Sequence, residues 1–189
     1  MGHAINSSLI INQADDNITY PGTSTSVFYD DNFYADCGKT GAYGNIKDNG
    51  CAICALATFV LHKGDLSASN NNVYNAVKQV TIEATNNAAD VTYNSFSVKV
   101  GSKTVRVNMR STSDIAAAVN DGDICFIRIE EGGKSHYVLV DGMDYSASGF
   151  DRYLIADPDG GEPRTLQDSF ERIHITANAN NITEKYILS

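Results

Sequence analysis

Cys51, His136 and Asp157 are the residues of this chain whose types and settings suit covalent chemistry on a carbonyl group. Cys51 begins a strongly apolar stretch, and a thiol at the N-terminus of a helix has its pKa lowered by the helix dipole. A thiolate nucleophile also needs a base within hydrogen-bond reach, and that base needs a third group that holds its tautomer. The sequence therefore predicts a Cys-His-Asp triad.

The settings of His136 and Asp157 are expected to bring these two residues together. His136 opens an apolar strand after the flexible turn at 131–135, a position that can aim an imidazole at the edge of a cleft. Asp157 ends the next predicted strand. If the connection at 141–152 joins the two strands as antiparallel neighbours, the start of one lies level with the end of the other. A hydrogen bond between His136 and Asp157 is then expected.

Attack on a carbonyl group also requires hydrogen-bond donors for the oxyanion that forms. The backbone N–H of Cys51 is one candidate, because the first amides of a helix have no partner within that helix. Asn45, six residues upstream, is the second candidate. The predicted site thus consists of Cys51, His136, Asp157 and Asn45.

Three helices are expected to surround this chemistry. Residues 51–63 form an apolar stretch that ends where a basic residue is followed by glycine, which is typical of a helix end. Apolar side chains recur at spacings of three and four in residues 65–79, which predicts a second, half-exposed helix. A short helix is expected over 115–120, capped by Ser113 or Asp114.

Alternating apolar residues predict the strands of an antiparallel sheet. The strongest signal is a hairpin whose arms, 96–100 and 105–109, are joined by the turn at 101–103. Further strands are expected at 124–129, 136–140, 153–156 and 186–188. Helices followed by such a series favour an α+β fold with the N-terminal helix packed on the sheet.

We interpret the chain as one domain preceded by a short extension. Residues 1–26 are rich in Asn, Ser and Thr and are taken as the N-terminal extension, which leaves 27–189 as the domain. Residues 27–50 contain four aromatic side chains and then four glycines, a composition typical of an ordered irregular loop that supports a site.

Three motifs in this order resemble the papain-like cysteine peptidase domain of bacteriocin-processing (double-glycine leader) peptidases and their looser peptidase-like relatives. They are Gly-Cys opening a helix of small residues at 50–57, His-Tyr-Val-Leu-Val-Asp-Gly at 136–142, and Ile-Ala-Asp-Pro at 155–158. The resemblance spans roughly residues 27–170. It implies a papain-like fold, a peptidase that needs no cofactor, and a bacterial peptide or cell-wall peptide as substrate. It also implies Cys51 as nucleophile, His136 as base and Asp157 as the orienting carboxylate.

The chain departs from this family at the position of the oxyanion donor. The family usually has a glutamine there, whereas Asn45 stands at the spacing of the leader peptidases and Tyr29 in the slot of the looser group. Two other functions therefore stay open. One is a binding module that keeps the fold but has lost catalysis. The other is an acyltransferase, because the same triad would pass the same thioester to an amine.

The other cysteines and the acidic loop have alternative interpretations. Cys37 lies in an Asp-Cys-Gly sequence that imitates the strict leader peptidases, but no apolar helix follows it. Cys51 and Cys54 have the spacing of a redox pair, and with Cys37 and a histidine they could bind zinc, but the context that either function needs is missing. Cys54 and Cys125 are expected to be core thiols. The acidic residues of 157–162 lack the spacing of a calcium loop, so we interpret Asp159 and Glu162 as turn residues.

Composition narrows the class of protein and its partners. The chain has 189 residues, of which 42% are hydrophobic, so it can bury a core without the help of disulfide bonds or metal ions. With 14 basic and 23 acidic residues its net charge is −9, which makes nucleic acid and anionic membranes improbable partners. No run is long and apolar enough to span a membrane, and the first residues lack the pattern of a signal peptide. We expect a monomer, and the localisation stays open.

Overall fold

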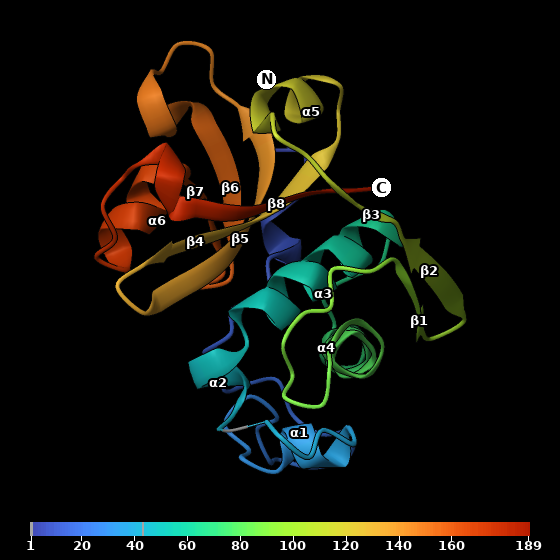
Figure 1. Ribbon diagram of the computed structural model, residues 1–189. Helices are drawn as coiled ribbons and strands as arrows, with labels where there is room; N and C mark the ends of the chain where they lie inside the picture. Colours follow the sequence, from blue (N-terminus) through green and yellow to red (C-terminus); the bar gives the residue numbers. More distant parts are fainter. Residues whose placement is uncertain (1, 43) are drawn as a thin grey trace.

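The apolar stretch after Gly50 forms α3 (Cys51–Lys63), as predicted, and much of the molecule packs around this helix (Figure 1). The computed structural model describes residues 2–42 and 44–189. Every residue of α3 from Ala52 to Leu61 is buried, which explains why its sequence shows no polar face. Gly50 is required before it, because a Cβ there would lie 2.4 Å from the backbone oxygen of Ile46. Glycine therefore precedes Cys51 because the backbone at position 50 lies too close to the backbone of Ile46 for a side chain.

The strands form one six-stranded antiparallel sheet and one separate hairpin, so the fold belongs to the α+β class. The order in the large sheet is β3-β8-β4-β5-β6-β7. Its strands are β3 (Met109–Ser111), β4 (Ile124–Glu131), β5 (Lys134–Met143), β6 (Tyr153–Asp157), β7 (Glu162–Thr165) and β8 (Ile182–Leu188). The four strands predicted after residue 120 are confirmed, although β5 and β8 are longer than expected.

The sheet buries both of its faces, because alternate residues of its central strands point to opposite sides. On β4, Ile124 and Phe126 belong to the core cluster that contains α3, whereas Cys125 and Ile127 belong to a second cluster. Two short helices, α5 (Ile115–Asn120) and α6 (Leu166–Arg172), contribute to that second cluster. The prediction of α5 is confirmed, with Asp114 as its cap.

The strand β7 and the helix α6 lie in a region that the sequence patterns did not predict. The interpretation of Glu162 as a turn residue is wrong, because Glu162 pairs with Asp157 as the first residue of β7. This edge strand consists of charged, proline and threonine residues and is too short to show an alternation of apolar and polar side chains, so the sequence gives no strand signal there. Thr165 and Asp168 then cap α6 reciprocally, which is the signal that could have located the helix.

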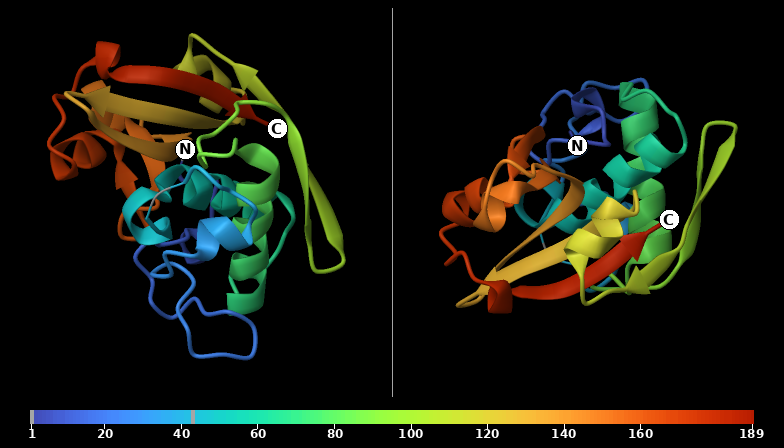
Figure 2. Two further views of the ribbon diagram at one scale, coloured as in Figure 1. Left: turned by 60° about the horizontal axis from the view of Figure 1, so that its bottom comes forward. Right: turned by 90° about the horizontal axis from the view of Figure 1, so that it is seen from above.

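The second long helix begins later than predicted. It is α4 (Asn70–Ala84) rather than 65–79, because Asp65 adopts a left-handed backbone conformation (φ 47°) and Ser69 caps the helix from outside. The predicted hairpin is confirmed as β1 (Phe96–Val100) and β2 (Lys103–Val107), although Lys103 belongs to the second strand and not to the turn, and the hairpin lies along α4 (Figure 2). The second predicted arm is interrupted after Val107, since Met109 already pairs with β8.

The segment interpreted as an N-terminal extension contributes to the core. Ile5, Ile10, Ile11 and Ile18 are buried in the cluster that contains α3, and the Ile11 N–H donates to Thr58 Oγ1 of that helix at 3.0 Å. The short elements of the first fifty residues are η1 (Ser7–Leu9), α1 (Phe33–Asp36) and α2 (Ile46–Asn49). Two further 3-10 turns are η2 (Gly149–Arg152) and η3 (Ala179–Asn181). Among the described residues, no helix has the length and apolarity that crossing a membrane requires.

Candidate active site

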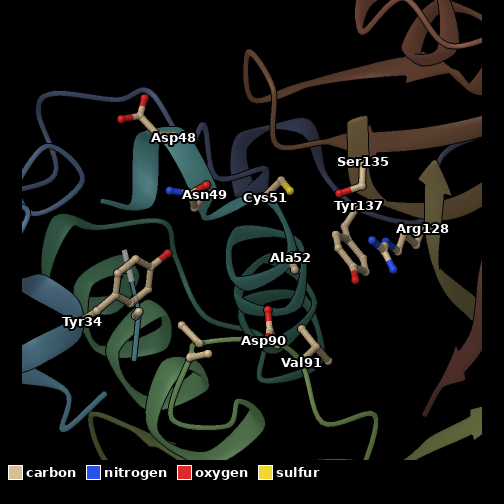
Figure 3. A pocket seen from close by; sticks show the side chains of 13 residues that line it. Tyr34, Asp48, Asn49, Cys51, Ala52, Asp90, Val91, Arg128, Ser135 and Tyr137 are labelled. Carbon is tan, nitrogen blue, oxygen red and sulfur yellow. The ribbon is translucent and has the colours of Figure 1, made fainter. Parts of the chain in front are cut away.

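Cys51 is the first residue of α3 and lies in a cleft of about 330 Å³ between the helical part of the molecule and the sheet (Figure 3). Its side chain is partly exposed, unlike those of the other three cysteines. The amides of the first turn of a helix point toward such a site, and the helix dipole favours negative charge there. The placement of Cys51 at a helix start, in a cleft, is the one that the sequence predicted.

His136 on β5 contacts both Cys51 and Asp157. Its Nε2 lies 2.7 Å from Asp157 Oδ1, and it also hydrogen-bonds to the Cys51 side chain. Since Nε2 is engaged with the carboxylate, Nδ1 is the ring nitrogen left for the sulfur. Burial alone would lower the pKa of His136, but the hydrogen bonds to Asp157 and Cys51 outweigh it and raise the pKa to about 10.

Asp157 is held rigidly behind the histidine. It ends β6, is fully buried, and its Oδ1 also accepts a hydrogen bond from the Asp159 N–H at 2.8 Å. Asp159 in turn pairs with Arg172 of α6, whose hydrogen bond lowers the pKa of the Asp159 carboxyl. The pairing of β5 with β6 brings Asp157 beside His136, so the hydrogen bond expected from the sequence is present.

The two side chains suggested as oxyanion donors are engaged away from the cleft. Asn45 caps α2: its Oδ1 accepts from the Asp48 N–H at 3.1 Å, and its Nδ2 donates to Asp31 Oδ1 at 2.9 Å. Tyr29 is 42% exposed, and its hydroxyl donates to the backbone oxygen of Ala14 at 3.1 Å. The sequence-based role of either side chain therefore has no geometric support, because cap geometry decided where Asn45 points.

Asn49, which sequence reasoning missed, lies in the cleft beside Cys51 (Figure 3). It is the last residue of α2 and is separated from Cys51 by Gly50 alone. Its place next to the Gly-Cys pair is the signal that could have drawn attention to it. The spacing of six residues instead pointed to Asn45, one helical turn earlier.

The other cysteines lie in settings that suppress nucleophilic chemistry. Cys37, Cys54 and Cys125 are buried free thiols. Burial raises the pKa of Cys37 to about 11 and that of Cys125 to about 12, and it also raises the pKa of Cys54. Cys37 is therefore a poor rival to Cys51. Within residues 2–42 and 44–189, no three His, Cys, Asp or Glu side chains come together as a metal site would require.

The cleft has two dissimilar walls. Helical and loop residues form one wall, which carries Tyr34 and the carboxylates of Asp48 and Asp90. The sheet supplies the other, with Arg128 from β4 and Tyr137 from β5 (Figure 3). The full set of described lining residues is Tyr34, Ala42, Asp48, Asn49, Cys51, Ala52, Ala88, Ala89, Asp90, Val91, Arg128, Ser135 and Tyr137. The walls come from segments far apart in sequence, which is why no local motif revealed the cleft.

Comparison with protein-family models finds no matching family, and searches of curated proteins and of solved structures find no match either. The support for a function therefore comes from the residues of the chain and their geometry. A thiol, an imidazole and a carboxylate bonded in series, with the sulfur open to a cleft, can form a thiolate–imidazolium pair and a covalent thioester.

Proposed function

We propose that this protein is a papain-like cysteine peptidase, a thiol hydrolase that cleaves a peptide or isopeptide bond with Cys51, His136 and Asp157. The observation that carries the proposal is the position of His136, which is hydrogen-bonded to both Cys51 and Asp157. The α+β class, the apolar helix that begins at Cys51 and the order of the three motifs are consistent with it.

The reaction follows from the positions of these groups. The Cys51 thiolate attacks the carbonyl carbon, and the oxyanion accepts a hydrogen bond from the Cys51 backbone N–H. The imidazolium of His136 donates its proton to the leaving amine, which departs as the thioester forms. Water then attacks the thioester, His136 accepts its proton, and the acid product leaves the regenerated thiolate.

Charge explains why the proton belongs on His136 before the substrate binds. Because the pKa of His136 is raised to about 10, the imidazolium persists at neutral pH. It faces the buried Asp157 on one side and the Cys51 sulfur on the other, so transfer of the thiol proton places opposite charges side by side. The helix start adds to this by favouring an anion at Cys51.

A catalytically inactive binding module of the same fold is the second candidate, and one observation favours it. Neither Asn45 nor Tyr29 offers a side-chain donor to the oxyanion. This alternative also requires that His136 fail to reach Cys51, whereas the two side chains are hydrogen-bonded.

Transfer of the acyl group to an amine, instead of to water, would use the same thioester. An assay of the products with and without added amine separates transfer from hydrolysis.

The proposal is tested by measuring the rate of iodoacetamide labelling of each cysteine against pH, with peptide mapping. We expect Cys51 to label rapidly well below pH 8.5, the ordinary pKa of a free thiol, and to lose this reactivity in His136→Ala. The buried Cys37, Cys54 and Cys125 serve as internal standards for unfolding. His62→Ala is the matched control, because His62 lies at the opposite end of the same helix. Slow labelling of Cys51 that does not depend on His136 would overturn the proposal.

A further inference from the structure

Arg128 is the cation of the cleft, and it lies on the sheet wall. Its side chain is 28% exposed, and its guanidinium carbon is 5.8 Å from the centre of the Tyr137 ring. The two residues are direct partners across β4 and β5, and Figure 3 shows the guanidinium beside the ring. Tyr137 is fixed in turn, since it stacks on Phe126 and its hydroxyl lies 2.7 Å from that of Tyr93. The guanidinium is therefore held on a rigid aromatic support.

The hydrogen-bonding capacity of Arg128 exceeds what the described residues use. Its Nη2 pairs with Glu130 Oε1 at 3.2 Å, on the same strand. Its Nε is buried and has no hydrogen-bond partner in the described part of the chain. Glu184, opposite Arg128 on β8, hydrogen-bonds to Tyr186. Since a guanidinium carries five N–H donors in a planar fork, this pairing leaves capacity for a ligand.

The charge around Arg128 makes its place in the cleft unusual. The chain has a net charge of −9, so the molecule as a whole repels anions. Among the described residues that line the cleft, Arg128 is the only cation, and the two carboxylates, Asp48 and Asp90, belong to the opposite wall. An anionic group of a ligand would therefore be attracted to the sheet wall and repelled by the opposite one.

We propose that Arg128, supported by Tyr137, forms a carboxylate-binding subsite that selects substrates with a carboxylate next to the bond attacked by Cys51. This inference rests on the proposed function and specifies its substrate class. A planar guanidinium recognises a carboxylate through two parallel hydrogen bonds, a geometry that lysine cannot reproduce. The carboxylate can belong to an acidic side chain or to a free chain terminus, because both present the same group.

The test measures how fast Cys51 is alkylated by reagents that differ only in charge. N-iodoacetyl-aspartic acid α-amide carries a side-chain carboxylate, and the corresponding asparagine amide is its neutral isostere. N-iodoacetyl-asparagine with a free α-carboxylate distinguishes a chain terminus from a side chain. In the wild-type protein we expect at least one acidic reagent to react about tenfold faster than the neutral one, the effect of one charge-assisted contact.

Variants assign this preference to Arg128. In Arg128→Gln the ratio of acidic to neutral rates should fall to about one, and in Arg128→Lys it should be intermediate, since the charge stays but the fork is lost. The matched control is Arg152→Gln: Arg152 also lies over a tyrosine ring, that of Tyr153 at 5.5 Å, but outside the cleft. The Arg152→Gln variant loses the same charge as Arg128→Gln and should leave the ratio of acidic to neutral rates unchanged.

The outcomes separate the subsite from the proposed function. Equal rates for acidic and neutral reagents in the wild type, or a preference that survives in Arg128→Gln, would overturn the subsite. The neutral reagent alone reports the activation of Cys51, so a slow reaction that does not depend on His136 would overturn the proposed function instead. Thermal unfolding of each variant checks that it is folded, and Arg128→Lys supplies the comparison if Arg128→Gln is not.

Discussion

Two histidine–aspartate pairs occur among the described residues, and both involve β5, but the two histidines differ in burial and in the ring nitrogen that contacts the carboxylate. His136 and Asp157 are 2.7 Å apart, with side-chain exposures of 5% and 0%. His3 and Asp141 are 2.8 Å apart, but the His3 side chain is 27% exposed. His136 uses Nε2 and keeps Nδ1 for a thiol, whereas His3 uses Nδ1. The first pair has Cys51 as a third reactive partner, whereas the described residues supply none to the second pair.

The second pair instead fastens a chain segment. Asp141 Oδ2 accepts the backbone N–H of Ile5 at 2.9 Å, and the backbone oxygen of Asp141 accepts that of Ala4 at 3.0 Å. These bonds hold the N-terminal segment against β5. The chemical role of a His–Asp contact therefore depends on its burial and on what the other ring nitrogen contacts. The following variants should therefore have different effects at the two pairs.

The largest difference is expected when each histidine is removed. His136→Ala should lower the labelling rate of Cys51 by iodoacetamide at pH 6 about 100-fold, because an ordinary thiol is less than roughly 1% ionised there. His3→Ala should change that rate less than about twofold, since His3 pairs with Asp141 and not with the sulfur. The measurement is single-site labelling followed by peptide mapping. Similar rates in the two variants would remove the distinction between the pairs.

The next difference concerns the charge on His136. Hydrogen bonding to Asp157 contributes to a His136 pKa of about 10, so the imidazolium persists from neutral pH upward and is lost as the pH rises through about 10. Asp157→Asn removes the carboxylate, so the loss should move to lower pH. The chemical shifts of the His136 ring C–H protons, followed by NMR as the pH is raised, measure the pH of this loss directly. Asp141→Asn is the control and should leave the His136 titration unchanged; a shift there would mean that the two pairs are coupled.

A smaller effect is expected from two glycines, one near each pair. An added Cβ at Gly50 would lie 2.4 Å from the Ile46 backbone oxygen, and at Gly142 it would lie 2.5 Å from that of Gly2. Gly50→Ala should therefore displace Cys51 and slow its labelling, with a loss of about 1–3 kcal/mol in the free energy of unfolding. Gly142→Ala should release the N-terminal segment and leave the labelling intact.

Urea unfolding and limited proteolysis near the N-terminus distinguish these two glycine variants. Gly50→Ala should unfold at lower urea concentration without new cleavage in the first residues of the chain. Gly142→Ala should show that cleavage. Slowed labelling of Cys51 in Gly142→Ala would instead indicate that the N-terminal segment positions the site.

The triad pattern was predictable from sequence because each member lies within two residues of the start or end of an element with a clear local signal. Cys51 begins a helix whose apolar residues are continuous, and Asp157 ends a strand. The pairing of that strand with β5 required only a short antiparallel connection. Helix α3 and the hairpin of β1 and β2 were predictable for the same reason, since both carry their periodicity within a few residues.

The features that escaped prediction depend on contacts between distant segments or on polar caps. The walls of the cleft are formed by α2, the loop before β1 and strand β4, which are far apart in sequence, so no sequence pattern indicates that Arg128 and Cys51 line the same cleft. The start of α4 was placed too early because Ser69, a cap, was less conspicuous than the charged Asp65. Asn45 was a candidate for the oxyanion because cap residues and oxyanion donors are drawn from the same polar types, and its side chain serves as a cap in the structure.

The smallest expected effect follows from this ambiguity and compares two asparagines four residues apart. Asn45→Ala removes the cap of α2 and should cost about 1 kcal/mol in the free energy of unfolding, with little change in the reactivity of Cys51. Asn49→Ala alters the cleft beside the sulfur and should change the labelling of Cys51 more than Asn45→Ala does. Urea unfolding and labelling measured on both variants give the two quantities. If Asn45→Ala instead slowed the labelling at unchanged stability, its amide would have to leave Asp31 and reach the sulfur of Cys51, and the assignment of Asn45 as a cap would be wrong.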